Sequence, residues 1–173
     1  MIQLAPLEWP HWKNYRRTVN DAEVARLIDR YLPVSELEHQ DFYRALLKDK
    51  SRIFFSIQNP RGKFIGVCAL KNIDSKNRKA ELYICLHGSP ARGKGYGAEA
   101  VKALLRYAFD TLNLNRVYLY TPAYNAAALR CYRSVGFVEE GRARQDLYSG
   151  GRYHDSVHMA FLRKLRAKTG RRK

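Results

Sequence analysis

The spacing of hydrophobic residues predicts three helices near the start of the chain, over residues 8–20, 21–31 and 35–47. In the first of these, Trp9, Trp12 and Tyr15 recur at every third residue and therefore share one face. Aromatic residues at this spacing are typical of a protein core, although the same face could also contact a substrate. Ser35 and Glu38 have the spacing of a capping box, which marks the start of the third helix.

Shorter hydrophobic runs bounded by turn residues predict seven strands, at residues 2–7, 52–57, 64–70, 80–86, 117–121, 137–147 and 154–162. The turn residues of 59–62 and of 149–151 indicate that the strands on either side of each turn pair as a hairpin. Helical spacing returns over residues 98–112 and 125–136, between the later strands. Hairpins on both sides of a central strand predict a mixed α/β (α+β) fold with a mixed sheet.

The length and composition indicate one globular domain. A chain of 173 residues suits a single core, and 46% hydrophobic with 28% charged residues is too hydrophobic for a disordered chain. We expect the domain to span residues 1–162, followed by a basic and frayed tail over 163–173. No basic segment followed by an apolar run opens the chain, and no run of about 18 apolar residues occurs. We therefore expect a cytoplasmic protein.

The chain is strongly basic, with 32 Lys and Arg against 16 Asp and Glu and a formal net charge of +16. Seven of the basic residues lie in the tail, so the body of the domain is positive as well. Such a field attracts anions and is compatible with an acidic acceptor, with RNA or with solubility alone. An RNA-binding module is therefore an alternative, supported by aromatic residues among basic ones at Tyr148, Arg152 and Tyr153. No recognised RNA signature accompanies them.

The cysteines do not predict a metal site. Cys68, Cys85 and Cys131 are scattered, and none of the five His residues lies near them at a metal-binding spacing. Each cysteine lies in an apolar segment, which is typical of small buried residues in a reducing compartment. We therefore expect no metal cofactor.

A glycine-rich loop at residues 91–97 is the strongest candidate for a binding site. Gly93, Gly95 and Gly97 leave the backbone free to take positive φ angles, and the loop joins a buried strand to a helix. The N–H groups and the dipole at the start of that helix favour a phosphate. Lys94 precedes a glycine rather than Ser or Thr, which argues against a P-loop, and the sixth place of the dinucleotide-binding fingerprint is not a glycine.

Two segments resemble the signatures of the GNAT superfamily of N-acetyltransferases. The loop reads Arg92-x-x-Gly95-x-Gly97, which is similar to the pyrophosphate loop of that family, Gln/Arg-x-x-Gly-x-Gly/Ala. Residues 125–137 are similar to its second signature, Asn-x-x-Ala-x-x-x-Tyr-x-x-x-Gly-Phe. The end of the chain resembles the closing hairpin of the branch that contains ribosomal-protein alanine, spermidine and amino-sugar acetyltransferases.

This resemblance implies a GNAT-like mixed sheet of about seven strands flanked by helices, with a splayed pair of central strands. It also implies that acetyl-CoA is the cosubstrate, that no metal is needed, and that a primary amine attacks the thioester directly. The positions that correspond to coenzyme-binding residues are Ile84, Cys85, Leu86, His87, Arg92, Gly93, Lys94, Gly95, Tyr96, Gly97, Asn125 and Tyr132.

The resemblance assigns one catalytic role, because Tyr132 corresponds to the general acid that protonates the departing thiol. Glu81 is the candidate base for the amine, directly or through water, because burial of a carboxylate in an apolar central strand would raise its pKa toward a useful value. Glu81 could instead form an ion pair with a neighbouring Arg or Lys. Asn125 could bind the pantetheine arm, cap its helix, or do both, because an amide offers donors and an acceptor.

Net charge is the only feature of the sequence that ranks the possible acceptors. A basic body should repel polyamines such as spermidine, so we expect an anionic acceptor first, either a nucleotide-linked amino sugar or the N-terminus of an acidic protein. A polyamine is the alternative within the same family. Because members of the family often dimerise, a homodimer is also considered.

Overall fold

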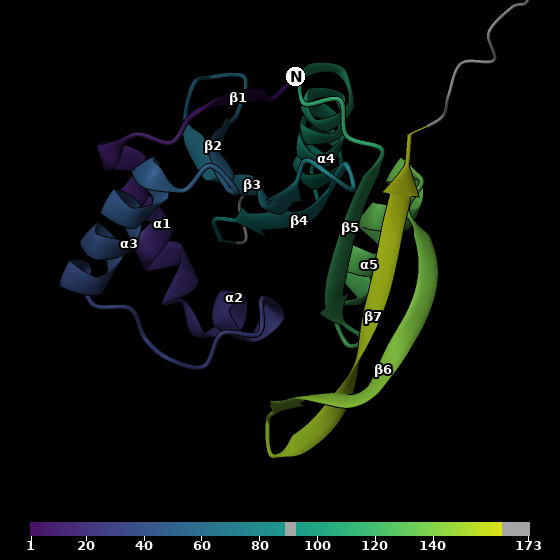
Figure 1. Cartoon of the computed structure of the whole chain (residues 1–173). Coiled ribbons are helices and arrows are strands. Elements are labelled where there is room, and N and C mark those ends of the chain that lie inside the picture. Colours follow the sequence, from purple (N-terminus) through teal and green to yellow (C-terminus); the bar gives the residue numbers. More distant parts are fainter. Residues whose placement is uncertain (89–92, 164–173) are drawn as a thin grey trace, which may run out of the picture.

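One seven-stranded sheet organises the chain in the computed structural model, which describes residues 1–88 and 93–163 (Figure 1). The strands, in the order β1-β2-β3-β4-β5-β7-β6, are β1 Gln3–Pro6, β2 Ile53–Gln58, β3 Phe64–Asp74, β4 Lys79–Leu86, β5 Arg116–Pro122, β7 Arg152–Leu162 and β6 Val138–Ser149. Neighbouring strands pair antiparallel except β4 and β5, which are parallel. The predicted mixed sheet of seven strands is therefore confirmed.

Helices cover both faces of this sheet. They are α1 Trp9–Val19, α2 Ala22–Leu27, α3 Glu36–Lys48, α4 Tyr96–Arg106 and α5 Ala126–Val135. The first three pack on one face through a core that includes Trp12 and Cys85. α4 and α5 pack on the other face through a larger core that includes Leu104 and Tyr132. We call these the α1 face and the α4 face of the sheet.

The aromatic residues of the first helix divide between core and surface. Trp12 is fully buried, and the Tyr15 ring is buried beside it at a centroid distance of 5.6 Å. Trp9 is 38% exposed. The Tyr15 hydroxyl donates to the hydroxyl of Tyr83 over 3.1 Å, which ties α1 to β4. Core packing therefore accounts for Trp12 and Tyr15.

Caps and backbone breaks explain where the helices begin and end. The predicted capping box is present at the start of α3, where Glu38 N–H donates to Ser35 Oγ over 3.2 Å and Ser35 N–H donates to the Glu38 carboxylate over 2.8 Å. The helix expected over 21–31 ends early, at Leu27, because Asp29 takes a positive φ of 53°.

The helix expected over 98–112 changes character partway along. It is α-helical to Arg106 and continues as a π-helical segment, Tyr107–Thr111. The residues of the expected basic tail lie outside the described part of the chain, except for Arg163.

The parallel strands β4 and β5 separate along their length. Their register joins three residue pairs, the last of which is Glu81 with Tyr118, whereas β4 continues to Leu86 and β5 to Pro122. Figure 1 shows the two strands diverging. β3 stays paired with β4 as far as Leu86, so the gap opens only on the β5 side of β4. The splayed pair of central strands is therefore present.

Candidate active site

The glycine-rich loop has the backbone conformation that its sequence predicts. Gly93 and Gly95 have φ angles of 72° and 77°, and Gly95 is the N-cap residue of α4. A Cβ at either glycine would meet no described atom within 4 Å, so the space beside the loop is open. Lys94 and Tyr96 flank Gly95, while Arg92 lies outside the described residues. Open space at a helix N-terminus fits a diphosphate.

Gly97, in contrast, lies in a packed environment. A Cβ at this position would lie 3.6 Å from Cys131 Sγ and 3.7 Å from Leu86 Cδ1. The start of α4 therefore packs against both α5 and the end of β4. This packing places the loop beside the gap between β4 and β5.

The end of β4 presents only part of its backbone to the gap. The N–H of His87 donates to the carbonyl of Ile65 over 2.8 Å, so it is not available to an acetyl carbonyl. Opposed residues of an antiparallel pair alternate between hydrogen-bonded and non-hydrogen-bonded pairs. Ile84 and Leu86 therefore direct their N–H and C=O groups away from β3, toward the gap, whereas Cys85 and His87 direct theirs toward β3.

Sequence reasoning misses Gly66, which lies opposite Leu86 on β3. A Cβ at Gly66 would overlap the carbonyl oxygen of Cys85 and lie 2.9 Å from Leu86 Cα. The glycine therefore permits a close approach of β3 to β4 beside the gap. Its signal in the sequence is a single glycine inside the apolar run 64–70, which often marks such an approach.

Glu81 lies at the point where the two strands separate, and it is 8% exposed. Its carboxylate accepts a hydrogen bond from Asn72 Nδ2 over 2.8 Å and forms an ion pair with Lys71 Nζ over 2.8 Å. Both carboxylate oxygens are thus held by β3. The ion pair that the sequence left as an alternative is present, and the catalytic role of Glu81 stays a prediction.

Tyr132 is buried on the α4 face, where its ring contacts Phe137 at a centroid distance of 5.7 Å. Burial raises the pKa of this phenol well above its usual value of about 10, and the neighbouring Cys131 and Cys85 thiols raise it further. Tyr132 is therefore protonated at neutral pH.

Asn125 caps α5, because its Oδ1 accepts a hydrogen bond from Ala128 N–H over 3.1 Å. Its Nδ2 donates to the carbonyl of Leu27 over 3.3 Å. The neighbouring Tyr124 hydroxyl donates to the carbonyl of Arg26 over 2.8 Å. The C-terminal end of α2 is thus tied to the start of α5. One N–H of the Asn125 amide is left for a ligand.

Acidic residues from three parts of the chain act on Tyr120 of β5, which is 51% exposed. Partial burial raises the pKa of Tyr120, and the negative charges of Glu81, Asp29 and Asp146 raise it further. Asp29 follows α2, and Asp146 on β6 accepts a hydrogen bond from Ser156 Oγ over 2.5 Å. Acidic side chains from elements far apart in the sequence thus act on one tyrosine of β5, while Lys71 balances the charge of Glu81.

The two candidate catalytic residues lie on opposite faces of the sheet. Ala80 and Leu82 belong to the core on the α4 face, so the alternation along β4 directs Glu81 to the α1 face. Tyr132 belongs to the core on the α4 face. A reaction centre in the gap would therefore have a carboxylate on one side and a phenol on the other.

No group of three or more potential metal ligands occurs among the described residues. None of the helices within the described ranges combines the length and the hydropathy that a membrane-spanning helix requires.

Comparison with known proteins identifies relatives of this chain. The spermidine N(1)-acetyltransferase of Vibrio cholerae is 30% identical over 125 residues, which cover 72% of each chain. The spermidine N(1)-acetyltransferase of Escherichia coli K12 is 29% identical over 93% of this chain and 86% of its own length. Bacillus subtilis YdaF, provisionally named a ribosomal N-acetyltransferase, is 37% identical over 60% of this chain and 56% of its own length.

The fold is also similar to solved structures. A crystal structure of the Vibrio cholerae spermidine N-acetyltransferase in complex with CoA and spermine matches with a TM-score of 0.88, 27% identity, and coverage of 93% of this chain and 95% of that chain. The family of the acetyltransferase (GNAT) domain matches residues 2–138. This match covers most of the chain and includes the glycine-rich loop, the splayed strands and α5. The chain therefore belongs to the GNAT acetyltransferases and is an acetyl-CoA-dependent N-acetyltransferase.

Proposed function

We propose that the amine acceptor binds on the α1 face of the gap and attacks the thioester there, while the thiol is protonated from the α4 face. The placement of Glu81 and Tyr132 on opposite faces of the splayed strands carries this proposal. The attacking amine must lose a proton and the departing sulfur must gain one. A base and an acid on opposite sides of the thioester meet both needs.

The residues around the gap fit the coenzyme. Residues 92–96 would hold the diphosphate through N–H groups and the positive end of the α4 dipole. Ile84 and Leu86 would pair with the amides of the pantetheine arm in the manner of an added strand. The free N–H of Asn125 would donate to the same arm. Bound acetyl-CoA supplies an acetyl group activated as a thioester.

Glu81 would remove the proton from the acceptor, directly or through water. An aliphatic amine with a pKa near 10 is cationic at neutral pH and attacks only after it has lost a proton. The contacts of the Glu81 carboxylate with Lys71 and Asn72 fix its position at the base of the gap. A fixed carboxylate can accept the proton without first losing side-chain freedom.

Replacing Glu81 by glutamine should lower kcat/KM at pH 7 by about 10²-fold, which is typical for loss of a general base. The deficit should shrink as the pH rises toward about 10, because the amine then loses its proton to solvent. Steady-state rates between these pH values measure the effect. Glu140→Gln, which removes a carboxylate paired with Arg116, is the matched control. A deficit that is constant across the pH range would contradict the base role and would indicate the lost ion pair instead.

We infer that the acceptor is a cationic amine of the polyamine class. Asp29 and Asp146 both act on Tyr120, and with the Glu81 charge balanced by Lys71 these two carboxylates would attract a cationic acceptor. Remote basic residues act through solvent and are screened beyond about 8 Å at physiological salt. The named activity of the Vibrio cholerae and Escherichia coli relatives agrees with this order. The anionic acceptor stays the second candidate, favoured by the net charge of +16.

A panel of acceptors tests this order through the rate of acetyl-CoA consumption. Spermidine should have a kcat/KM at least about tenfold above those of a peptide with a free N-terminal alanine and of a nucleotide-linked amino sugar, because local charge favours the cation. Added salt should lower the spermidine value. Asp146→Asn should reduce kcat/KM for spermidine, whereas Asp41→Asn on α3 should leave it unchanged. Faster turnover of the amino sugar would reverse the order.

We also include self-association in this proposal. A dodecameric structure of the Vibrio cholerae spermidine N-acetyltransferase matches this chain with a TM-score of 0.81 over 93% of its length. A homodimer would be the smallest assembly that this chain could form with copies of itself.

A further inference from the structure

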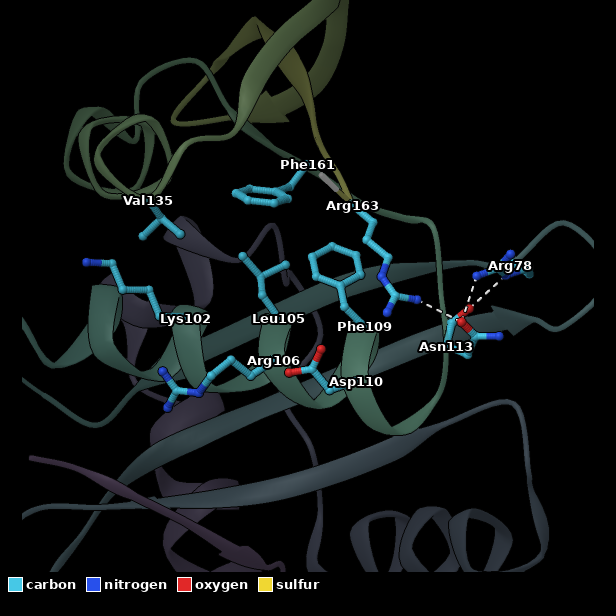
Figure 2. Close-up of a pocket in the computed structure, with 10 residues that line it drawn as sticks. All are labelled: Arg78, Lys102, Leu105, Arg106, Phe109, Asp110, Asn113, Val135, Phe161 and Arg163. Atoms are coloured by element: carbon cyan, nitrogen blue, oxygen red, sulfur yellow. Dashed lines mark hydrogen bonds between the residues drawn. The ribbon is translucent and has the colours of Figure 1, made fainter. Parts of the chain in front are cut away.

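A second hollow of about 930 Å³ lies between the C-terminal half of α4 and the end of β7 (Figure 2). Four cationic side chains line it, Arg78, Lys102, Arg106 and Arg163, against the single carboxylate of Asp110. They come from the turn between β3 and β4, from α4, and from the end of β7. We call this site the basic hollow. It is broad and open to solvent.

Two of these cations share one neutral acceptor. Arg78 Nη2 and Arg163 Nη1 both donate to Asn113 Oδ1, over 2.8 Å and 2.7 Å, as the dashed lines in Figure 2 show. Arg78 Nε also donates to the Asn113 carbonyl over 2.7 Å. Arg78 and Asn113 are exposed, so solvent weakens the repulsion between the two guanidinium groups, and an anion beside them would reduce it further. Neither forms an ion pair within the described ranges, and each keeps further N–H donors.

The backbone holds these arginines in place. Arg78 and Asn113 both take positive φ angles, 52° and 53°, which is uncommon for an arginine. The carbonyl of Arg78 accepts hydrogen bonds from Asn115 N–H over 2.7 Å and from Arg116 N–H over 3.1 Å, and Arg163 N–H donates to the Asn115 carbonyl over 2.8 Å. Strained backbone that its surroundings hold fixed is a feature of ligand sites. The donors are thus positioned before a ligand arrives.

The floor of the basic hollow is apolar and partly aromatic. The rings of Phe109 and Phe161 lie 5.6 Å apart, and Figure 2 shows them beside Leu105 and Val135. Phe109 and Leu105 are buried, while Phe161 and Val135 are half-buried. A flat ring system could stack there with its charged group at the arginines.

The basic hollow is separate from the gap between β4 and β5. It lies where these strands are still paired, near Arg78 and the start of β5. Arg106 is ten residues along α4 from Tyr96, so about 15 Å of helix separates it from the glycine-rich loop.

We propose that the basic hollow binds a nucleotide, with the phosphate at Arg78 and Arg163 and the base against Phe109 and Phe161. Three groups of observations support it: converging arginines that form no ion pair with a carboxylate of residues 1–88 or 93–163, a backbone that fixes them, and an aromatic floor. A phosphate takes several N–H donors at once, which a guanidinium pair supplies. The proposal does not depend on which amine is the acceptor.

Calorimetry with uridine 5′-monophosphate, on protein already saturated with CoA, tests the proposal. The nucleotide should bind in a 1:1 ratio, and uridine and inorganic phosphate should each bind at least about tenfold more weakly, because each makes half of the contacts. Absence of nucleotide binding would overturn the proposal. If the nucleotide bound to the CoA-free protein but not to the CoA-saturated protein, the proposal would also be overturned, because the hollow would then bind the coenzyme. A uridine oligonucleotide that binds about 100-fold tighter, with steep salt dependence, would instead indicate an RNA surface.

Substitutions locate the site. The double substitution Lys102→Gln and Arg106→Gln should weaken the binding of uridine 5′-monophosphate about tenfold or more. Neither side chain makes a hydrogen bond or ion pair with the described residues, so folding should be unaffected. Arg163→Gln should weaken binding by a similar factor. Arg61→Gln, in the turn at the other end of β3, removes one charge elsewhere and should have no effect. Equal affinities of all these variants would overturn the proposal.

Discussion

Replacing Tyr132 by phenylalanine is expected to lower kcat by about 10²-fold to 10³-fold while the affinity for CoA changes by less than about twofold. The ring stays packed on Phe137, so only the hydroxyl is lost. Burial raises the pKa of Tyr132, so the phenol keeps its proton throughout the neutral range. Because a raised pKa also makes the phenol a weaker acid, its transfer of a proton to the thiolate depends on direct contact with the departing sulfur. Steady-state kinetics and calorimetry with CoA measure the two quantities.

Tyr107→Phe is the matched control for this change. Tyr107 packs on Phe55 at a centroid distance of 5.1 Å, within the π-helical segment that follows α4 and away from the gap. Loss of its hydroxyl should leave kcat unchanged. An unchanged kcat for the Tyr132 variant would remove that residue from the mechanism. Parallel losses of kcat and CoA affinity would indicate a role in packing instead.

Replacing Gly66 by alanine is expected to have the largest effect on coenzyme binding. The new Cβ would overlap the Cys85 carbonyl oxygen and lie 2.9 Å from Leu86 Cα, and these backbone atoms cannot move aside as a side chain can. The end of β4 must therefore shift, and affinity for CoA should fall about tenfold or more. Overpacking should also cost about 1–3 kcal/mol, which lowers Tm by about 2–10 °C.

Gly141→Ala is the control for the alanine substitution. Gly141 lies in β6, and a Cβ there would meet no described atom within 4 Å. Its effect on stability should stay within about 0.5 kcal/mol. Thermal unfolding and calorimetry with CoA compare the two variants. If the Gly66 variant matched the Gly141 variant in both measurements, the close approach of β3 to β4 would not matter for the gap.

Local sequence predicts the parts of the site that depend on neighbouring residues. The positive φ angles of Gly93 and Gly95, the cap by Asn125 and the order of strand, loop and helix all follow from residues a few positions apart. Such features form wherever the chain carries the right turn and capping residues. These features could therefore be predicted from the sequence without knowing how the strands pair in the sheet.

Features that depend on long-range pairing could not be predicted in this way. The partners of Glu81 are set by the register of β3 against β4, and the acidic group around Tyr120 includes Asp29 and Asp146, which belong to different elements. Net charge sums over the whole surface and gives no information on such a local arrangement. Net charge alone therefore predicts an anionic acceptor, whereas the polyamine proposal depends on the positions of individual carboxylates.

The bonds from Tyr124 and Asn125 to the carbonyls of Arg26 and Leu27 join two segments 98 residues apart in sequence. A pantetheine arm that bound the Asn125 amide would therefore lie beside the end of α2, which leads to Asp29. Any effect of the coenzyme on acceptor affinity through these bonds would be matched by an equal effect of the acceptor on coenzyme affinity.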